Sequence, residues 1–251
     1  MTASRGVSVL STVAILGVLL LAWQIGSALG AIRPSVLPAP QAIGLALAAE
    51  VRQPAFWHDL GRTLEELVLS FVGGTMLGGL AGWAFWRQPL VGRMFEPYLV
   101  AFYAVPLVVF YPVAIVVIGL NEWPIVILAA LMTAIPMALN TWNGLSRIRP
   151  VYLVLGRSLR ASRFQTAVRL VLPAAAPLLF AGVKLGAVYS LIGVIAMEFL
   201  TASSGLGFEI RYQFEDFNDD RMYAYMAVVF LLSVLLTAAV ELAESRVLSR
   251  G

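Results

Sequence analysis

Cysteine is absent from the 251-residue chain, and histidine occurs only once, at His58. These absences exclude disulfides, thiolate metal sites, iron–sulfur ligation, cysteine nucleophiles and a histidine-rich metal centre, so we expect no metal site. Leu185 follows the only lysine, Lys184, whereas a Walker A loop needs Ser or Thr at that position. We therefore expect no ATP-binding P-loop and no cofactor in this chain.

Charge is also scarce, since only 12% of the residues are charged while 60% are hydrophobic. An average soluble domain has about 25% charged and about 45–50% apolar residues. A soluble globular domain could not cover this much apolar surface, and the same composition excludes a disordered chain. We expect an all-α integral membrane protein that lies in the lipid bilayer as a single domain over residues 1–251, with no nucleic-acid partner.

Long uncharged windows mark segments that can cross a bilayer, which takes about 20 mainly apolar residues. Residues 6–32 carry no charge, and this length fits a true span better than a signal peptide, whose apolar region is about 7–15 residues long. The whole pattern predicts six transmembrane helices, over about residues 7–30, 64–86, 97–119, 123–144, 171–197 and 222–243.

The arginines predict the orientation of these spans. A cytoplasmic N-terminus places eleven arginines in the inside segments and five in the outside loops, as the positive-inside rule favours. The loop over 147–169 carries six arginines and no acid, whereas residues 198–220 are rich in Asp and Glu. We expect a multi-pass protein of the cell (inner) membrane, with both termini and the 147–169 loop in the cytoplasm.

The 147–169 loop has helical spacing in its first half, after Pro150, which suits a first helical turn. One face collects Val151, Val154, Leu155, Ser158, Leu159 and Ser162. Gly156, Arg160 and Arg163 fall on the opposite face. The helix predicted around 150–163 is either an interfacial helix lying on anionic headgroups or a docking helix for a cytoplasmic partner.

The same loop resembles the E-A-A-x3-G-x9-I-x-L-P motif of binding-protein-dependent ABC importer permeases. Anchored on Leu172-Pro173, the motif places its E-A-A triplet on Val154-Leu155-Gly156, its glycine on Arg160 and its isoleucine on Leu170. The adjoining Ala161-Ser162-Arg163-Phe164 is similar to the family's A-S-R-aromatic run. The end of the motif matches, while its glutamate and glycine are missing.

Two other stretches carry the resemblance further. Leu37-Pro38-Ala39-Pro40 resembles the L-P-x-P entry of the family. The segment from Ala196 to Ile210, which contains Glu198 and Ser203-Ser204-Gly205-Leu206-Gly207, resembles the A-E-x-L-x-A-S-S-G-L-G-x-x-I run of its taurine, alkanesulfonate and nitrate branch. The resemblance covers roughly residues 35–245, and in this region Pro106, Pro112, Pro136, Pro173 and Pro177 are expected to interrupt spans three to five.

This resemblance implies a type I ABC importer permease fold and a set of partners. A cytoplasmic ATPase dimer binds the ATP, a second permease subunit completes the path, and an extracytoplasmic substrate-binding protein delivers the solute. The solute is a small polar or anionic compound, such as a sulfonate or nitrate, or a pyrimidine or flavin precursor. The residues expected to couple to the ATPase are Val154, Leu155, Gly156, Ser158, Leu159, Arg160, Ala161, Ser162, Leu172 and Pro173.

The altered loop also bears on the subunit arrangement. A homodimer would carry two copies of a loop that lacks the glutamate at Val154 and the flexible glycine at Arg160. We expect two such docking sites to couple weakly, so the sequence favours a heterodimer with a second permease that has the standard loop. A homodimer is the alternative.

Four residues inside or next to the spans are candidates for the translocation path: Lys184, Tyr189, Glu198 and Asn140. Lys184 lies eleven residues past Pro173, near mid-bilayer, where a charge is costly and indicates function. It either faces the path of an anionic solute or ties two helices together. Glu198 is about 21 Å further along the helix, so the two charges need different partners.

Three glycines, Gly74, Gly78 and Gly82, repeat every four residues, a pattern that lets helices approach closely. They pack either within the subunit or against a second permease.

Two other function classes fit the sequence less well. A membrane-embedded enzyme would need convergent acid, base or nucleophile groups, which the spans lack. A self-sufficient secondary carrier would be longer, with internal repeats.

Overall fold

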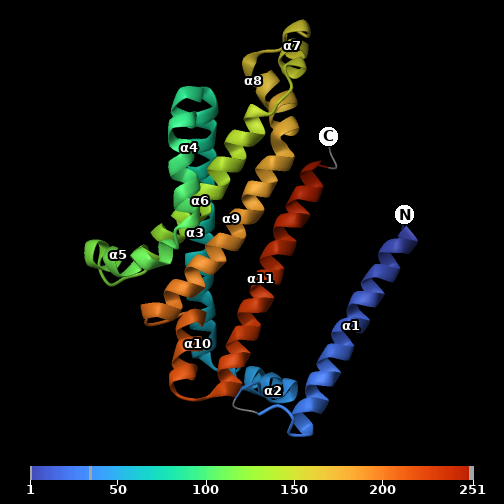
Figure 1. Cartoon of the computed structure of the whole chain (residues 1–251), viewed down its shortest axis with the longest axis vertical. Helices are drawn as coiled ribbons and strands as arrows, with labels where there is room; N and C mark the ends of the chain where they lie inside the picture. Colours follow the sequence, from blue (N-terminus) through green and yellow to red (C-terminus); the bar gives the residue numbers. More distant parts are fainter. Residues whose placement is uncertain (1, 34–35, 249–251) are drawn as a thin grey trace.

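In the computed structural model, which describes residues 2–33 and 36–248, the described chain is helical and contains no strand. Short connections join the helices (Figure 1). The elements in chain order are α1 (Thr2–Ala28), α2 (Pro40–Glu50), α3 (Pro54–Arg87), α4 (Pro89–Ala104), the 3-10 turn η1 (Leu107–Phe110), α5 (Tyr111–Ile118), α6 (Trp123–Ser146), α7 (Pro150–Ser158), α8 (Arg163–Thr166), the π-helical turn η2 (Ala167–Val171), α9 (Leu172–Thr201), α10 (Leu206–Glu215) and α11 (Asp219–Leu248).

Proline starts most of these helices. It occupies one of the first two positions of α2, α3, α4, α5, α6, α7 and α9. A proline has no N–H to lose there, and its fixed φ suits the first helical turn. Pro112 thus begins α5 rather than interrupting a helix, which corrects the expectation from the sequence, whereas Pro173 begins α9 but lies inside the continuous helical segment Phe164–Thr201. Pro136 and Pro177 do lie inside α6 and α9.

The centre of the fold is α6, which packs between α3 and α9. Its contact with α3 depends on Gly74, Gly78 and Gly82, which are all buried. A Cβ added to any of the three would collide with the backbone or side chains of α6 between Ala130 and Trp142. The three glycines therefore lie in a close contact within the subunit, which is the first of the two packing alternatives.

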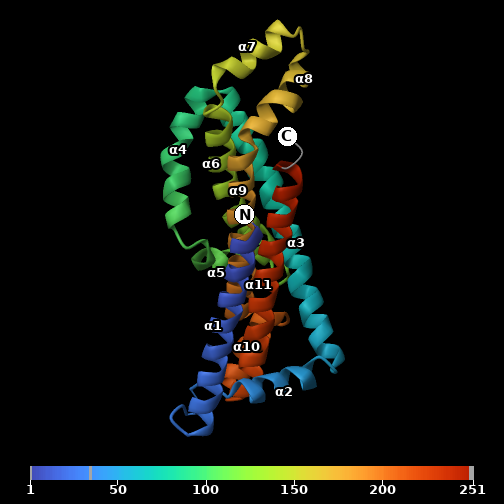
Figure 2. The same cartoon turned by 90° about the vertical axis from the view of Figure 1, so that its right-hand side faces the viewer.

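The two ends of the molecule are built differently. At one end, which we call the α7 end, α7 and α8 extend beyond the helical bundle (Figure 1). At the other, the α10 end, the short helices α2 and α10 lie beside the ends of the long ones (Figures 1 and 2). Helix α11 runs from the α10 end toward the α7 end, and α1 runs in the opposite direction, down to α2 at the α10 end (Figure 1). Helix α1 stands apart from the bundle and packs mainly on α2.

Among the described residues, four helices are long and apolar enough to cross a membrane: Pro54–Arg87, Trp123–Ser146, Phe164–Thr201 and Asp219–Val247. The third expected span, over 97–119, is not one straight helix, because α4 and the segment Leu107–Ile118 meet at an angle of 84°. Pro106 lies at this break and cannot donate a backbone hydrogen bond. Counted as one span, the bent pair makes five, and the sixth span, over α1, stays a prediction.

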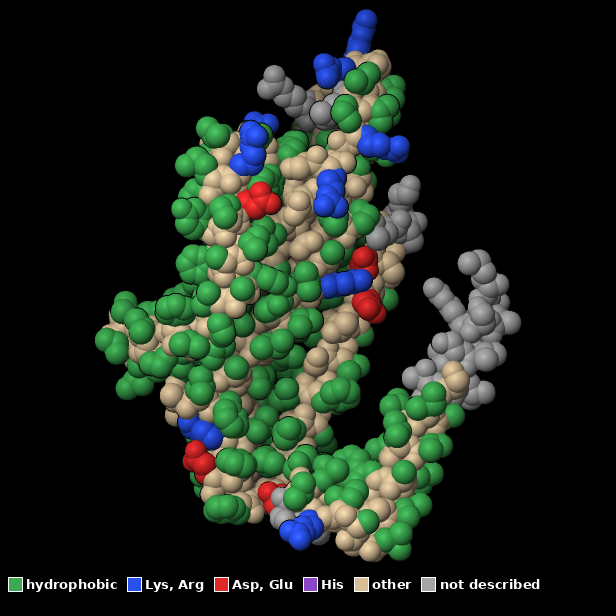
Figure 3. Space-filling model, viewed as in Figure 1, with side chains coloured by type: hydrophobic (Ala, Val, Ile, Leu, Met, Phe, Trp, Pro, Cys, Tyr) green, Lys and Arg blue, Asp and Glu red, His purple; other side chains and the backbone are tan. Residues whose placement is uncertain are grey.

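The surface agrees with a protein that lies in a membrane. Hydrophobic side chains cover the long flanks of the bundle (Figure 3). Lys and Arg side chains gather toward the α7 end of the same face (Figure 3). Large apolar residues such as Leu80, Val116 and Phe230 are more than 60% exposed in the subunit alone. An aqueous surface of this kind would be costly, whereas lipid or a partner subunit covers it without cost.

Candidate functional site

Helix α7 is the core of the segment that the sequence singles out for coupling. It begins at Pro150 after Arg149, whose backbone is extended, and it ends at Ser158. The predicted helix over 150–163 is therefore shorter than expected, and Ser162 does not lie on its face. The helix is followed by a turn, then by α8 and the π-helical turn η2, which leads into α9.

The turn after α7 is a Schellman motif. The N–H of Ala161 donates to the carbonyl of Gly156 at 2.9 Å, and the N–H of Arg160 donates to that of Arg157 at 3.0 Å. Arg160 has a φ of +49°, in the left-handed region that glycine normally occupies in this motif. The missing glycine therefore does not prevent the turn. Arginine adopts the same backbone at a cost of about 1–2 kcal/mol.

The apolar face of α7 is exposed and has no partner in the part of the chain that the structure describes. Val151, Val154, Leu155 and Leu159 expose between 43% and 67% of their surface. Ser158, on the same face, is also exposed. A short amphipathic helix gains little stability by itself, and its apolar face must be buried against something else. This exposed face is the part of the segment that is free to contact another molecule.

The opposite side of α7 is fixed against α8. Gly156 is buried, and a Cβ there would come within 2.7 Å of the Thr166 hydroxyl oxygen, so only glycine permits this close contact. Ser162 caps α8 through a reciprocal pair. Its hydroxyl accepts from the N–H of Gln165 at 3.1 Å, and its own N–H donates to the Gln165 side chain at 2.9 Å. Gly156 and Ser162 thus position the coupling segment rather than forming its exposed face.

The segment is joined to α9 without a flexible linker. Pro173, in the first turn of α9, cannot donate to the carbonyl four residues earlier, and its ring crowds that carbonyl. The chain widens there into the π-helical turn Ala167–Val171, as helices often do at such a disruption. One apolar helical unit, Phe164–Thr201, results. A displacement of α7 and α8 can therefore reach α9 through continuous helix.

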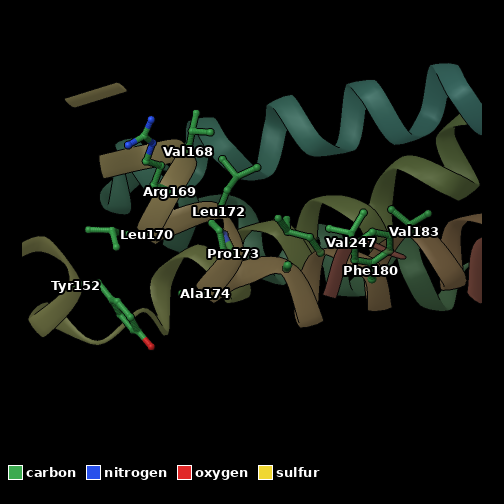
Figure 4. Close-up of a pocket in the computed structure, with 12 residues that line it drawn as sticks. Tyr152, Val168, Arg169, Leu170, Leu172, Pro173, Ala174, Phe180, Val183 and Val247 are labelled. Carbon is green, nitrogen blue, oxygen red and sulfur yellow. The ribbon is translucent and has the colours of Figure 1, made fainter. Parts of the chain in front are cut away.

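An open cleft of about 700 Å³ lies beside this junction. Figure 4 shows Tyr152 from α7 at one side of it and Val183 from α9 and Val247 from α11 at the other. Leu172 and Pro173 form part of its wall. The cleft gives the π-helical turn and α7 space on one side, so the junction is not enclosed by packed side chains.

The structure does not bring the four predicted path residues together. Asn140 donates to the carbonyl of Pro136 at 2.8 Å, in its own helix. Tyr189 stacks obliquely on Tyr103, with ring centroids 5.3 Å apart. Lys184 and Glu198 have separate partners, as their separation along α9 predicts. No shared site for these four side chains is formed within the part of the chain that the structure describes.

Lys184 ties α9 to α11. Its Nζ forms an ion pair of 2.5 Å with Glu244, which lies one residue past the last predicted span. This contact places Lys184 level with the part of α11 nearer the α7 end. Glu241 adds a second carboxylate on the same side. The structure thus favours the tether between helices over a charge that faces the path.

Glu198 is the centre of a buried polar cluster at the α10 end. Its side chain is fully buried and accepts from the Thr63 hydroxyl at 2.7 Å and from the N–H of Gly207 at 2.8 Å. The same Thr63 oxygen accepts from the N–H of Leu206 at 2.8 Å, and Asp59 accepts from the N–H of Gly205 at 3.0 Å. Three backbone N–H groups at the start of α10 are thereby satisfied by side chains.

This cluster explains the Ser-Ser-Gly-Leu-Gly run in physical terms. Gly205 has a φ of +108°, and a Cβ on it would collide with the Glu198 carboxyl group. A Cβ on Gly207 would come within 2.6 Å of the Glu198 Cβ. Sequence analysis missed the partners Asp59 and Thr63. Their helical spacing with Glu66 and Ser70 on one face of α3 was the available signal.

A second charged group lies beside the cluster. Arg62 donates to Glu66 at 2.8 Å and to Glu122 at 3.2 Å, so it joins α3 to the start of α6. The pKa of Glu122 lies below its usual value, first because the backbone N–H of Glu122 bonds its carboxylate and second because Arg62 donates to it.

No group of three or more potential metal ligands occurs among the described residues.

The chain was compared with known proteins. The family model described as "Binding-protein-dependent transport system inner membrane component" matches residues 74–249. The taurine transport system permease protein TauC of Escherichia coli is 26% identical over 92% of this chain and 86% of its own. The formylaminopyrimidine transport permease protein ThiX of Halalkalibacterium halodurans is 28% identical over 90% of both.

A solved structure of the MetNI methionine ABC transporter, in an inward-facing conformation, supports the fold. It superposes with a TM-score of 0.63 at 20% identity, over 78% of this chain and 98% of the matched one. At this identity the likeness is evidence for the fold alone.

Proposed function

The chain belongs to the family of binding-protein-dependent transport system inner membrane components, and from this premise we propose that α7 couples it to an ATPase. It is a permease subunit of an ABC importer with the type I fold, and not an enzyme. The exposed apolar face of α7, formed by Val151, Val154, Leu155 and Leu159, carries the proposal. A cytoplasmic ATPase dimer, which binds the ATP, would bury this face.

The mechanism follows from how α7 is attached. Binding of ATP closes the ATPase dimer, and α7 moves with it as a rigid body. The Gly156–Thr166 contact and the capped α8 pass this motion to the π-helical turn and then to α9. Because α9 packs on α6, a shift of α9 changes the packing of the helical bundle. The solute path then opens to one side of the membrane or to the other.

The proposal also covers the orientation of the permease in the membrane and its partner outside the cell membrane. The basic α7 end lies in the cytoplasm with both termini, and the α10 end faces outward. There an extracytoplasmic substrate-binding protein delivers a small polar or anionic solute, or a pyrimidine or flavin precursor. Exposed Phe214 and Phe217, next to the acidic loop over 215–220, support a docking surface at this end for that protein.

The second permease subunit is a different chain with the standard loop. The missing glutamate at Val154 and the left-handed Arg160 support this heterodimer, although the turn itself keeps its shape. Co-expression and pull-down test it. Recovery of an untagged copy of this chain with the ATPase, and of no second permease, would establish the homodimer instead.

The coupling proposal is tested by replacing Leu155 with Asp in the assembled transporter. The charge would enter a buried contact, so ATP hydrolysis stimulated by loaded binding protein should fall about tenfold or more, which corresponds to about 1.4 kcal/mol. The matched control is Leu90→Asp, at a leucine of α4 that is 69% exposed. An unchanged stimulation in Leu155→Asp would refute the proposed coupling, provided that the variant inserts normally.

A further inference from the structure

A polar cavity of about 280 Å³ lies at the α10 end, between α3, α5, α9 and the loop before α10. Its lining includes a guanidinium, four hydroxyl groups and an amide, on Arg62, Tyr111, Thr201, Ser203, Ser204 and Asn121. A cavity of this size suits a solute smaller than a drug molecule, for which pockets of about 300–1,000 Å³ are usual. Polar groups from separate elements converge on it, which an accidental packing gap would not require.

Arg62 is the only charged donor in this lining, and two carboxylates orient it. Its Nε donates to Glu66 and its Nη2 to Glu122. A guanidinium has five N–H donors, so three remain beyond these two bonds. Glu66 is only 2% exposed, so its buried carboxylate holds the Arg62 guanidinium in one position. A guanidinium fixed in this way loses little conformational freedom when it binds a further group. Planar N–H donors of this kind, together with hydroxyl groups, match an oxyanion.

The charges around the cavity limit the kind of oxyanion that fits. Arg62 carries one positive charge, whereas Glu66 and Glu122 carry two negative charges when ionised, so the group as a whole attracts positive charge. A simple anion would gain hydrogen bonds but be repelled by the surplus carboxylate. A solute with both an oxyanion and a positively charged nitrogen satisfies the donors and the net charge together.

We propose that this cavity is a solute-holding subsite of the permease, and that it prefers a small zwitterion whose oxyanion binds Arg62. The proposal rests on the import function proposed above and adds to it a specificity determinant in the membrane subunit. The ammonium end of the solute would lie toward Glu66, the carboxylate that lines the cavity, with Glu122 beyond it on the other side of Arg62. Tyr111, Thr201 and the two serines would complete the hydrogen bonds of the oxyanion.

Thermal unfolding of the purified chain in detergent tests the proposal with matched probes. Taurine and β-alanine carry both charges, ethanesulfonate has only the oxyanion and ethylammonium only the cation. At millimolar concentrations the zwitterions should raise Tm by about 3 °C, and the single-charge analogues by less than half as much. No shift with either zwitterion, or equal shifts with all four probes, would overturn the proposal.

Two variants locate the subsite. Arg62→Lys keeps the charge but loses the planar fork, and Ser203→Val removes a hydroxyl at the cavity wall; both should abolish the shift. The control Arg52→Gln changes an exposed arginine at the same end and should keep it. A shift that survives in both cavity variants would also overturn the proposal. Coupling through α7 is measured separately, so a failure here leaves the import function standing.

Discussion

The α7 end and the α10 end of this subunit differ in where their polar and apolar groups find partners. At the α10 end, Glu198, Thr63 and Asp59 satisfy the backbone of α10 from inside the same chain. At the α7 end, the apolar face of α7 stays exposed, with nothing to cover it among the residues that the structure describes. The buried cluster of the α10 end is complete as folded, while the face of α7 would be covered only by a partner.

We expect mutations at the two ends to have different effects. Changes at the α10 end remove bonds that hold the fold together, so they act on stability. Changes on the exposed face of α7 remove contacts that form only in the complex, so they act on assembly with little effect on the isolated chain. The rigid path from α7 through the π-helical turn to α9 is what joins the two ends.

The largest effect on stability is expected for Glu198→Ala. The variant leaves the Thr63 hydroxyl and the N–H of Gly207 without their acceptor, and each buried orphaned donor costs about 1–3 kcal/mol. The free energy of unfolding in detergent should fall by about 2–6 kcal/mol. Glu215→Ala, at a side chain that is 68% exposed, is the control. Equal stability of the two variants would show that the buried cluster does not hold the α10 end.

Gly205→Ala should be the next most harmful change. A φ of +108° is strained for alanine, and the new Cβ meets the Glu198 carboxyl group. We expect a loss of about 2–3 kcal/mol in the same unfolding measurement. Gly61→Ala, at an open helical position, should instead gain up to about 1 kcal/mol. A neutral Gly205→Ala would mean that this turn is not built as described.

Arg160→Gly should raise the stability of the subunit, whereas the two preceding variants lower it. The left-handed φ of +49° costs arginine about 1–2 kcal/mol that glycine does not lose, but glycine also gains freedom in the unfolded chain. The net gain in unfolding free energy should be about 1 kcal/mol, and hydrolysis stimulated by binding protein should rise or stay level. A destabilised Arg160→Gly would indicate that the arginine side chain holds the turn through its own contacts.

Ser162→Ala should have the smallest effect on global stability. The loss of a helix cap costs about 0.5–2 kcal/mol, and it acts here on the short helix α8. Amide exchange should speed up in residues 162–166 and remain unchanged in α10. Faster exchange across the whole chain would instead place Ser162 in the global core.

Much of the fold could be predicted from the sequence, because the length of an apolar run and the arginines that flank it can be read from a single segment of the chain. Four of the expected spans correspond to helices that meet the length and hydropathy requirement. The interruption of the third span at Pro106 was predicted and is confirmed, whereas the 84° bend was not, since a proline alone does not indicate how far the chain turns at a break. The length of α7 was overestimated because helical spacing continues by chance to Ser162.

The candidate sites were less accessible to sequence analysis. Thr63, which donates to Glu198, lies 135 residues away from it along the chain, and Asp59, which accepts from Gly205, lies 146 residues away from that glycine, so only the folded structure brings them together. Lys184 was expected near mid-bilayer from its distance past Pro173, and its partner Glu244 could not be assigned from spacing. The shared helical face of Val151, Val154 and Leu155 was predictable, because one short helix determines it.

Hydrogen–deuterium exchange of the subunit, alone and in complex with its ATPase dimer, tests the difference between the two ends most directly. The account predicts that exchange in residues 150–158 slows when the ATPase binds, because its contacts suppress opening of α7. Exchange in residues 206–215 should be slow in both states, since Glu198 and Thr63 already hold the start of α10. Unchanged exchange in α7, or protection gained only in α10, would contradict the account.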